Sequence, residues 1–326
     1  MRTKKNNKQD STPIYGFDKE IGFWGLKNLR HEAYFDYEIE NPVKIFHNSD
    51  GMREEEFSID NRKSLLCCGG SHTWGAGIKQ NERYSDLLKN YVDLRVVNIG
   101  HCSLGLDQII LSIIRKTEKF NPEIIVIEQY VWALHRVITK HINGYLRPSF
   151  YFDEHENLKV NKIPFYHRFK WLRKAIGNYH DYKKELNEYI EGINIKKEYN
   201  LEEDPIFLSW KTEFYSPMYK LIDSLLELIK SYCDDNQIKL FFCLGPLKNQ
   251  LDFNSKSDLV DYDLPSRKFK SLLTKHNINF LDTKEHMIKK HSQRPVIFPD
   301  GHLNSYGHSL LSEIIYYELK NLKWIK

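Results

Sequence analysis

The stretch CCGGSHTWGAGI, residues 67–78, places a serine in a glycine-rich turn directly after an apolar run. Residues 64–69 have the length and the continuous apolar character of a buried strand, and the glycines that follow allow a tight turn. A serine in such a turn acts as a nucleophile, as a phosphate-binding hydroxyl or only as a turn residue. The remainder of the sequence bears on which of these uses applies to Ser71.

Apolar runs of strand length alternate with helical patterns on the C-terminal side of this turn. Further strands are predicted at 95–100, 123–129, 238–245 and 278–283. Apolar residues at three- and four-residue spacing predict helices within 82–92, 104–120, 216–235 and 265–277. Continuous apolar strands separated by helices predict an α/β fold with a parallel sheet covered on both faces. Ligands of such sheets bind beyond the carboxyl ends of the strands, which is where Ser71 lies.

The chain divides into three predicted parts. Residues 1–13 are basic and polar, and we expect a disordered tail. Residues 14–60 are aromatic and irregular, and we expect an extended segment packed on the core. Residues 61–326 form the α/β domain, interrupted at about 141–215 by aromatic, charged sequence that we interpret as a mostly helical insertion. This insertion either covers the substrate or elaborates the surface.

Composition and charge limit the partners. A net charge of +4 from 48 basic and 44 acidic side chains gives no strong field for nucleic acid or lipid. The first residues lack the apolar stretch of a signal peptide, and no run reaches the roughly 20 apolar residues of a membrane span. We therefore expect a cytoplasmic protein that binds no nucleic acid, with its oligomeric state left open.

The cysteines and histidines do not have the spacing of a metal or disulfide framework. Five cysteines lie in or beside apolar runs, and we expect reduced thiols, with Cys102 nearest to the site. Four histidines gather near the C-terminus without a known ligand pattern, namely His286, His291, His302 and His308. We expect neither a metal site nor an organic cofactor.

The serine turn does not match three common motifs. The dinucleotide pattern G-x-G-x-x-G and the P-loop pattern are absent, and Thr73 breaks the G-x-S-x-G nucleophile elbow. A serine hydroxyl is a weak nucleophile until a base takes its proton, so a histidine partner is expected elsewhere. The loop FPDGH, residues 298–302, supplies Asp300 and His302 two positions apart. An aspartate so close can orient the imidazole and stabilise its protonated form.

The order of these motifs resembles the SGNH hydrolases, also called the GDSL-like family, in their bacterial, carbohydrate-esterase-like branch. Residues 69–78 are similar to that family's serine block, residues 96–108 to its second block, residues 122–136 to its third and residues 300–308 to its last. The resemblance implies a three-layer α/β/α flavodoxin-like fold. It also implies ester hydrolysis or acyl transfer, often on acylated sugars or polysaccharides.

Three positions depart from the family pattern. Gly70 stands where the family usually has an aspartate, and Ser103, after Gly100, stands where a glycine is expected. Trp132 stands where the third block usually has an asparagine. The loss of one oxyanion donor typically costs about 10²–10³ in turnover. The side chains that could replace that donor are Gln129, Trp132 and Arg136, and Gly100 is a further candidate for the oxyanion or substrate site.

The leading hypothesis is a serine esterase or deacylase that acts on an acyl ester of a sugar or polysaccharide precursor. Ser71 would attack the ester, His302 would take its proton and Asp300 would orient the imidazole, while the N–H groups of Ser71 and Ser103 receive the oxyanion. An O-acyltransferase would use the same residues. A catalytically inactive saccharide-binding module is the other alternative. His72 is expected to pack or to face solvent, and His308 is expected to pack or cap on the last helix.

Overall fold

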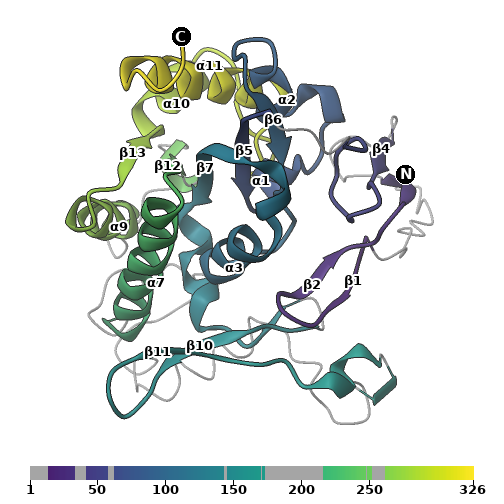
Figure 1. The fold of residues 1–326 in the computed structure, drawn as a ribbon. Helices are drawn as coiled ribbons and strands as arrows, with labels where there is room; N and C mark the ends of the chain where they lie inside the picture. The colour runs from purple at the N-terminus through teal and green to yellow at the C-terminus, as the bar shows by residue number, and fades with distance from the viewer. Residues whose placement is uncertain are drawn as a thin grey trace, which may run out of the picture.

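The computed structural model describes residues 14–33, 42–57, 62–142, 145–169, 171–172, 216–246, 248–251 and 261–326. A five-stranded parallel sheet of order β13-β12-β7-β5-β6 lies at its centre (Figure 1). Its strands are β5 (Ser64–Gly69), β6 (Arg95–Asn98), β7 (Pro122–Tyr130), β12 (Lys239–Gly245) and β13 (Asn279–Asp282). Each lies within two residues of a predicted strand, so the predicted α/β fold with a parallel sheet is confirmed.

Helices cover both faces of the sheet and complete three layers (Figure 1). One face packs against α3 (Leu106–Lys116), α7 (Ser216–Asp235) and α9 (Leu264–Lys275). The other face packs against α2 (Tyr84–Leu88), α8 (Lys248–Leu251), α10 (Lys284–His291) and α11 (Ser305–Asn321). No helix in the described ranges is both long enough and apolar enough to cross a membrane.

Strand β5 shows why the central strands are apolar without interruption. Alternate side chains of a strand point to opposite faces. Leu65 and Cys67 therefore pack with α2 and α11, whereas Leu66 and Cys68 pack with α3 and α7, and all four are fully buried. The adjacent thiols point apart, and all five cysteines of the chain are free.

The segment before the sheet forms two antiparallel hairpins. Strand β1 (Tyr15–Asp18) pairs with β2 (Gly22–Gly25), and β3 (Arg30–Ala33) pairs with β4 (Val43–Phe46). Ile21, Phe23 and Trp24 enter the same apolar cluster as α3. The tail predicted at residues 1–13 lies outside the described residues.

The described part of the insertion contains hairpins where helices were predicted. Strand β8 (His141–Ile142) pairs with β9 (Tyr145–Leu146), and β10 (Ser149–Phe152) pairs with β11 (Leu158–Asn161) before the 3-10 turn η4 (Phe165–Arg168). Asp153 explains the second hairpin, because its carboxylate accepts the N–H groups of His155 and Asn157 and closes the turn. Residues 173–215 lie outside the described ranges, so the role of the insertion stays a prediction.

Candidate active site

Two glycines shape the turn that carries Ser71. Strand β5 ends at Gly69, and the short helix α1 (Ser71–Trp74) begins immediately after Gly70. A Cβ atom on Gly69 would lie 2.1 Å from Oγ1 of Thr73, so only glycine lets α1 fold back over the strand end. Gly75 then ends α1 with a φ of 86°, in the left-handed region that glycine enters without strain.

The hydroxyl of Ser71 contacts a histidine instead of capping its own helix. Gly70 occupies the N-cap of α1, and no side chain caps that helix. Oγ of Ser71 lies 2.8 Å from Nε2 of His302. The strand-to-helix turn therefore directs this hydroxyl across the carboxyl edge of the sheet to the loop before α11.

His302 is held by Asp300 through two hydrogen bonds. Nδ1 of His302 lies 2.8 Å from Oδ2 of Asp300, and the backbone N–H of His302 donates to Oδ1 at 3.0 Å. A carboxylate only accepts, so Nδ1 carries the hydrogen and Nε2 accepts the hydroxyl hydrogen of Ser71. The three side chains form one chain of hydrogen bonds, in which Ser71 donates to His302 and His302 donates to Asp300.

The charge on Asp300 fits this arrangement. Partial burial opposes ionisation of its carboxyl group, but the hydrogen bonds and the electrostatic interaction with His302 outweigh burial and lower the pKa of Asp300 below the ordinary value. Asp300 is therefore a carboxylate at neutral pH. A carboxylate at this position stabilises a positive charge that develops on the imidazole.

The loop after β6 lies beside the serine turn. Leu104 brings its carbonyl oxygen to 3.9 Å from where a Cβ on Gly70 would stand. Ser103, just before it, has a φ of 67°, a left-handed conformation that costs a residue with a side chain about 1 kcal/mol or more. The N–H of Gly100 donates to Oδ1 of Asn98 at 2.9 Å, so Gly100 shapes the loop and its N–H is already used.

The three residues considered as replacement donors have different surroundings. Gln129 is almost fully buried, and its amide donates to the carbonyl of Tyr130 at 2.8 Å. Arg136 donates to the carbonyl of Leu104 at 3.0 Å and lies over the ring of Trp132, 5.2 Å from its centre. The structure thus brings Arg136 and Trp132 to the Ser103 loop, whereas the Gln129 amide is buried and already bonded to the carbonyl of Tyr130.

Sequence reasoning did not single out Glu128, whereas His72 packs in the interior, as one of its expected placements. Glu128 is 1% exposed near the end of β7, and His72, which follows Ser71, is 5% exposed. Their nearest atoms, Nδ1 of His72 and Oε1 of Glu128, are 3.4 Å apart. The signal was a single carboxylate inside the apolar run IIVIEQ, because an acidic side chain in a buried strand is costly unless it has a task.

The other histidines and Cys102 have local roles. His308 is fully buried, and its Nδ1 accepts the N–H of Tyr84 at 3.1 Å. Nδ1 of His291 accepts the N–H of Val296 at 3.3 Å. Burial raises the pKa of the Cys102 thiol to about 12, against the influence of Arg53 and Arg136. Within the described ranges, no group of three or more histidine, cysteine, aspartate or glutamate side chains is placed to hold a metal ion.

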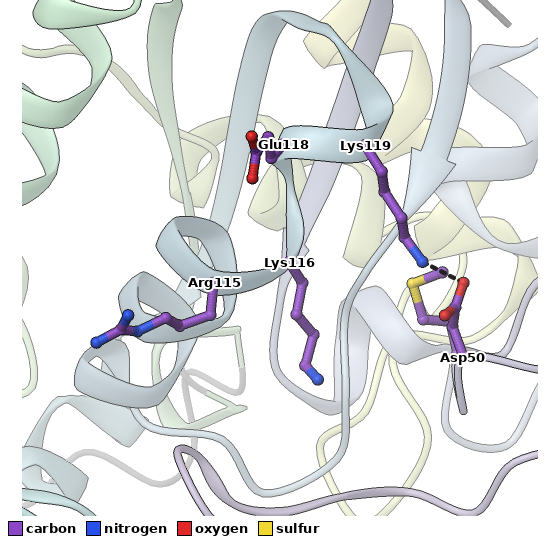
Figure 2. A pocket seen from close by; sticks show the side chains of 6 residues that line it. Asp50, Arg115, Lys116, Glu118 and Lys119 are labelled. Atoms are coloured by element: carbon purple, nitrogen blue, oxygen red, sulfur yellow. Dashed lines mark hydrogen bonds and ion pairs between the residues drawn. The ribbon is translucent and has the colours of Figure 1, made fainter. Parts of the chain in front are cut away.

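A separate cavity of about 520 Å³ lies at the opposite edge of the sheet, where α3 ends and β7 is about to begin. Figure 2 shows Lys119 directed at Asp50, with which it forms an ion pair, while Arg115 extends away from that pair. The remaining lining side chains are Met52, Lys116 and Glu118. The lysine and arginine side chains interact favourably with the negative, C-terminal end of the α3 dipole. None of the six lining residues is a serine, cysteine or histidine.

The fold and the site define an α/β protein in which a serine, a histidine and an aspartate meet at the carboxyl edge of a parallel sheet. No family model matches the chain, and no curated protein sequence matches it. Solved structures do match. An acetyl xylan esterase is 11% identical, with a TM-score of 0.46 over 79% of this chain and 99% of that one.

Two further solved structures are similar. A member of the lipolytic protein G-D-S-L family from Veillonella parvula is 12% identical, with a TM-score of 0.41 over 79% of this chain and 97% of that one. A lipase/acylhydrolase from Enterococcus faecalis is also 12% identical, with a TM-score of 0.43 over 81% and 97%. Members of the family that the sequence motifs resemble are thus among the structures of similar fold. At TM-scores of this size the likeness carries no argument about chemistry, which follows from the geometry of the site itself.

Proposed function

We propose that this protein is a serine esterase or deacylase that removes an acyl group from a sugar or polysaccharide precursor. The observation that carries the proposal is the hydrogen-bonded line from Ser71 through His302 to Asp300, with both side-chain contacts at 2.8 Å. A nucleophile bonded to a base, which is itself oriented by a carboxylate, is the arrangement that acyl transfer requires.

The reaction proceeds in two halves. Oγ of Ser71 attacks the acyl carbonyl carbon while Nε2 of His302 takes the hydroxyl proton, and Asp300 stabilises the imidazolium. The imidazolium then gives that proton to the leaving alkoxide, which departs as an alcohol. Water attacks the acyl-serine with His302 as the base, releasing the carboxylic acid and restoring Ser71.

The oxyanion is received by the backbone N–H groups of Ser71 and Ser103. The position of Leu104 beside Gly70 supports this assignment, because it brings the Ser103 loop to the serine turn. Arg136 holds that loop through the carbonyl of Leu104 and adds a positive charge nearby.

Aromatic rings beside the base support a saccharide substrate. The ring of His72 lies between His302, at 5.4 Å, and Tyr130, at 4.7 Å, and Tyr130 in turn lies 6.3 Å from Trp132. Trp132 is partly exposed. A partly exposed aromatic face with a cation beside it offers both the apolar surface and the polar group that a sugar ring requires.

Intact-mass analysis after treatment with a fluorophosphonate tests the proposal. We expect one adduct on the wild type and none on Ser71→Ala or His302→Ala. The exposed residues Ser305 and His155 provide matched controls, and Ser305→Ala and His155→Ala are expected to retain the adduct. A folded wild type that takes no adduct would favour the saccharide-binding module and overturn the esterase.

A second measurement separates hydrolysis from acyl transfer. The untreated wild-type protein is incubated with an activated acetyl ester, with and without an added sugar. Release of acetate alone supports the esterase, whereas acetylated sugar formed in competition with water identifies an O-acyltransferase.

A further inference from the structure

A buried carboxylate lies behind the proposed base. Glu128 occupies the central strand β7 and is 1% exposed. Its surroundings are tight, because a Cβ on Gly245 of the neighbouring strand would lie 3.1 Å from Oε1. Removing a carboxylate from water costs several kcal/mol unless a cation or several donors compensate.

Neutral donors satisfy only one oxygen of Glu128. Oγ1 of Thr73 lies 3.3 Å from Oε2 of Glu128 and 3.1 Å from the phenolic oxygen of Tyr84. A threonine hydroxyl has one hydrogen, and the carbonyl of Cys68, 3.4 Å from Oγ1, competes with Glu128 for it. Within the described ranges, Oε1 has no hydrogen-bond partner, although Nδ1 of His72 lies 3.4 Å away.

His72 connects this carboxylate to the proposed base. Its Nδ1 is buried and also has no hydrogen-bond partner among the described residues. Its ring contacts the ring of His302 nearly edge to face, with centroids 5.4 Å apart. His72 is therefore the cation nearest to Glu128 once protonated, and it lies against the group that takes the proton of Ser71.

We infer that His72 and Glu128 form a buried imidazolium–carboxylate pair that positions His302 and keeps its Nε2 unprotonated before the reaction. This inference rests on the proposed function. The pair acts through His302 and contacts no substrate, so both members are positioning residues. A cation at His72 opposes early protonation of His302, while Glu128 behind it limits that repulsion once His302 becomes positive.

Other titratable groups lie on the elements around Glu128, His72 and His302. They are Tyr130 on β7, Cys243 on β12, Lys248 on α8, Asp300 in the loop, Tyr84 on α2 and His308 on α11. Tyr130 and Cys243 are neutral near pH 7, because burial raises the pKa of each. Burial lowers the pKa of His308 well below its ordinary value, so that ring is also neutral. Asp300, which interacts with both histidines, remains as the fixed charge beside the two rings.

The pH dependence of fluorophosphonate labelling tests the pair. Rates are measured for the wild type, His72→Asn, Glu128→Gln and the double variant between about pH 5 and 9. Asparagine keeps a neutral donor near the position of Nδ1, so it preserves the contact without the charge. We expect His72→Asn to shift the acid limb of the plot of labelling rate against pH to higher pH, by roughly half a unit or more. The reason is that Glu128 is then uncompensated and favours the protonated form of His302.

The two variants that lack Glu128 test the direction of this shift. Glu128→Gln and the double variant leave no extra negative charge, so neither is expected to move the limb upward. Coincident limbs for wild type and His72→Asn would overturn the inference, because that result means that His72 carries no charge in the wild type.

Nitrogen chemical shifts of the wild type give a measurement that does not depend on activity. His72 is assigned by the signal that His72→Asn loses, and the exposed His155 serves as the reference. We expect the ring nitrogens of His72 to show the chemical shifts of an imidazolium at neutral pH, and the shifts of a neutral ring would overturn the pair. Absence of labelling in the wild type would remove the proposed function alone, because these spectra still report the state of His72.

Discussion

At Gly69 the absence of one methyl group lets the serine turn form. A Cβ there would lie 2.1 Å from Oγ1 of Thr73 and 2.8 Å from the carbonyl oxygen of Glu128. Both neighbours belong to packed elements and have little room to move. The adjacent Gly70 is different, because its nearest neighbour to such a Cβ is the Leu104 carbonyl at 3.9 Å.

We predict that Gly69→Ala destabilises the protein by about 1–3 kcal/mol through overpacking and slows labelling of Ser71, because α1 must shift. Gly70→Ala is the matched control and is expected to change stability by less than about 0.5 kcal/mol. Urea unfolding and labelling rates measure both effects. Equal behaviour of the two variants would show that the close approach at Gly69 does not constrain α1.

Some site residues can be predicted from the sequence alone, and others cannot. Ser71, His302 and Asp300 follow from chemical need, because a serine after a strand requires a base and an aspartate two residues from a histidine can orient it. Glu128 could not be assigned a partner in the same way. Its contact with His72 depends on the register of α1 over β7, which only packing determines.

Elements were predictable where both faces of the chain had to be buried. The five sheet strands were found because continuous apolar runs leave little choice of structure. The N-terminal hairpins and β10–β11 were missed, because their half-exposed residues show no strong period. The eight-residue 3-10 helix η3 (Val131–Ile138), which follows β7, was also missed, since its apolar residues read equally well as loop.

One buried ion pair joins the elements around the Ser103 loop. Arg147, after β9, bonds Asp107 at the start of α3 at 2.5 Å, and both side chains are fully buried. Arg147 also donates to Gln108 on α3 and to Thr139 after η3, each at 2.6 Å. A single guanidinium thus connects the insertion, α3 and η3.

We predict that Arg147→Met destabilises the protein by about 3–5 kcal/mol, because Asp107 keeps its burial and loses its cation. Burial already raises the pKa of Asp107 against the attraction of Arg147. The control is Lys230→Met, which removes an exposed pair with Asp234 and is expected to cost no more than about 1 kcal/mol. Denaturant unfolding of both variants measures the loss of stability. A similar loss of unfolding free energy in the two would contradict this role of Arg147.

The whole molecule buries several histidines as neutral rings. Burial lowers the pKa of His47 to about 4 and that of His101 and His135 to about 3 each, and it lowers the pKa of His308 well below its ordinary value. Unfolding exposes these rings to water, where they titrate near their ordinary pKa of about 6.5. Below that pH the unfolded chain binds protons that the folded chain does not.

We therefore predict that stability is fully present above about pH 6.5 and falls as the pH drops toward about 4. Each such histidine contributes about 1.4 kcal/mol per pH unit within that window. The slope of the unfolding free energy against pH in this window should correspond to one fewer proton in His101→Gln than in the wild type. An unchanged slope in that variant would show that His101 does not titrate on unfolding.

The proposed nucleophile and base are 231 residues apart in the sequence, and four of the five sheet strands, β6, β7, β12 and β13, lie between them in the chain. A ribosome therefore finishes the serine turn long before it makes the imidazole that would activate it. During that interval the growing chain carries only an ordinary alcohol. On the proposed function, Ser71 therefore lacks its base until the loop before α11 has been made and has folded against the sheet.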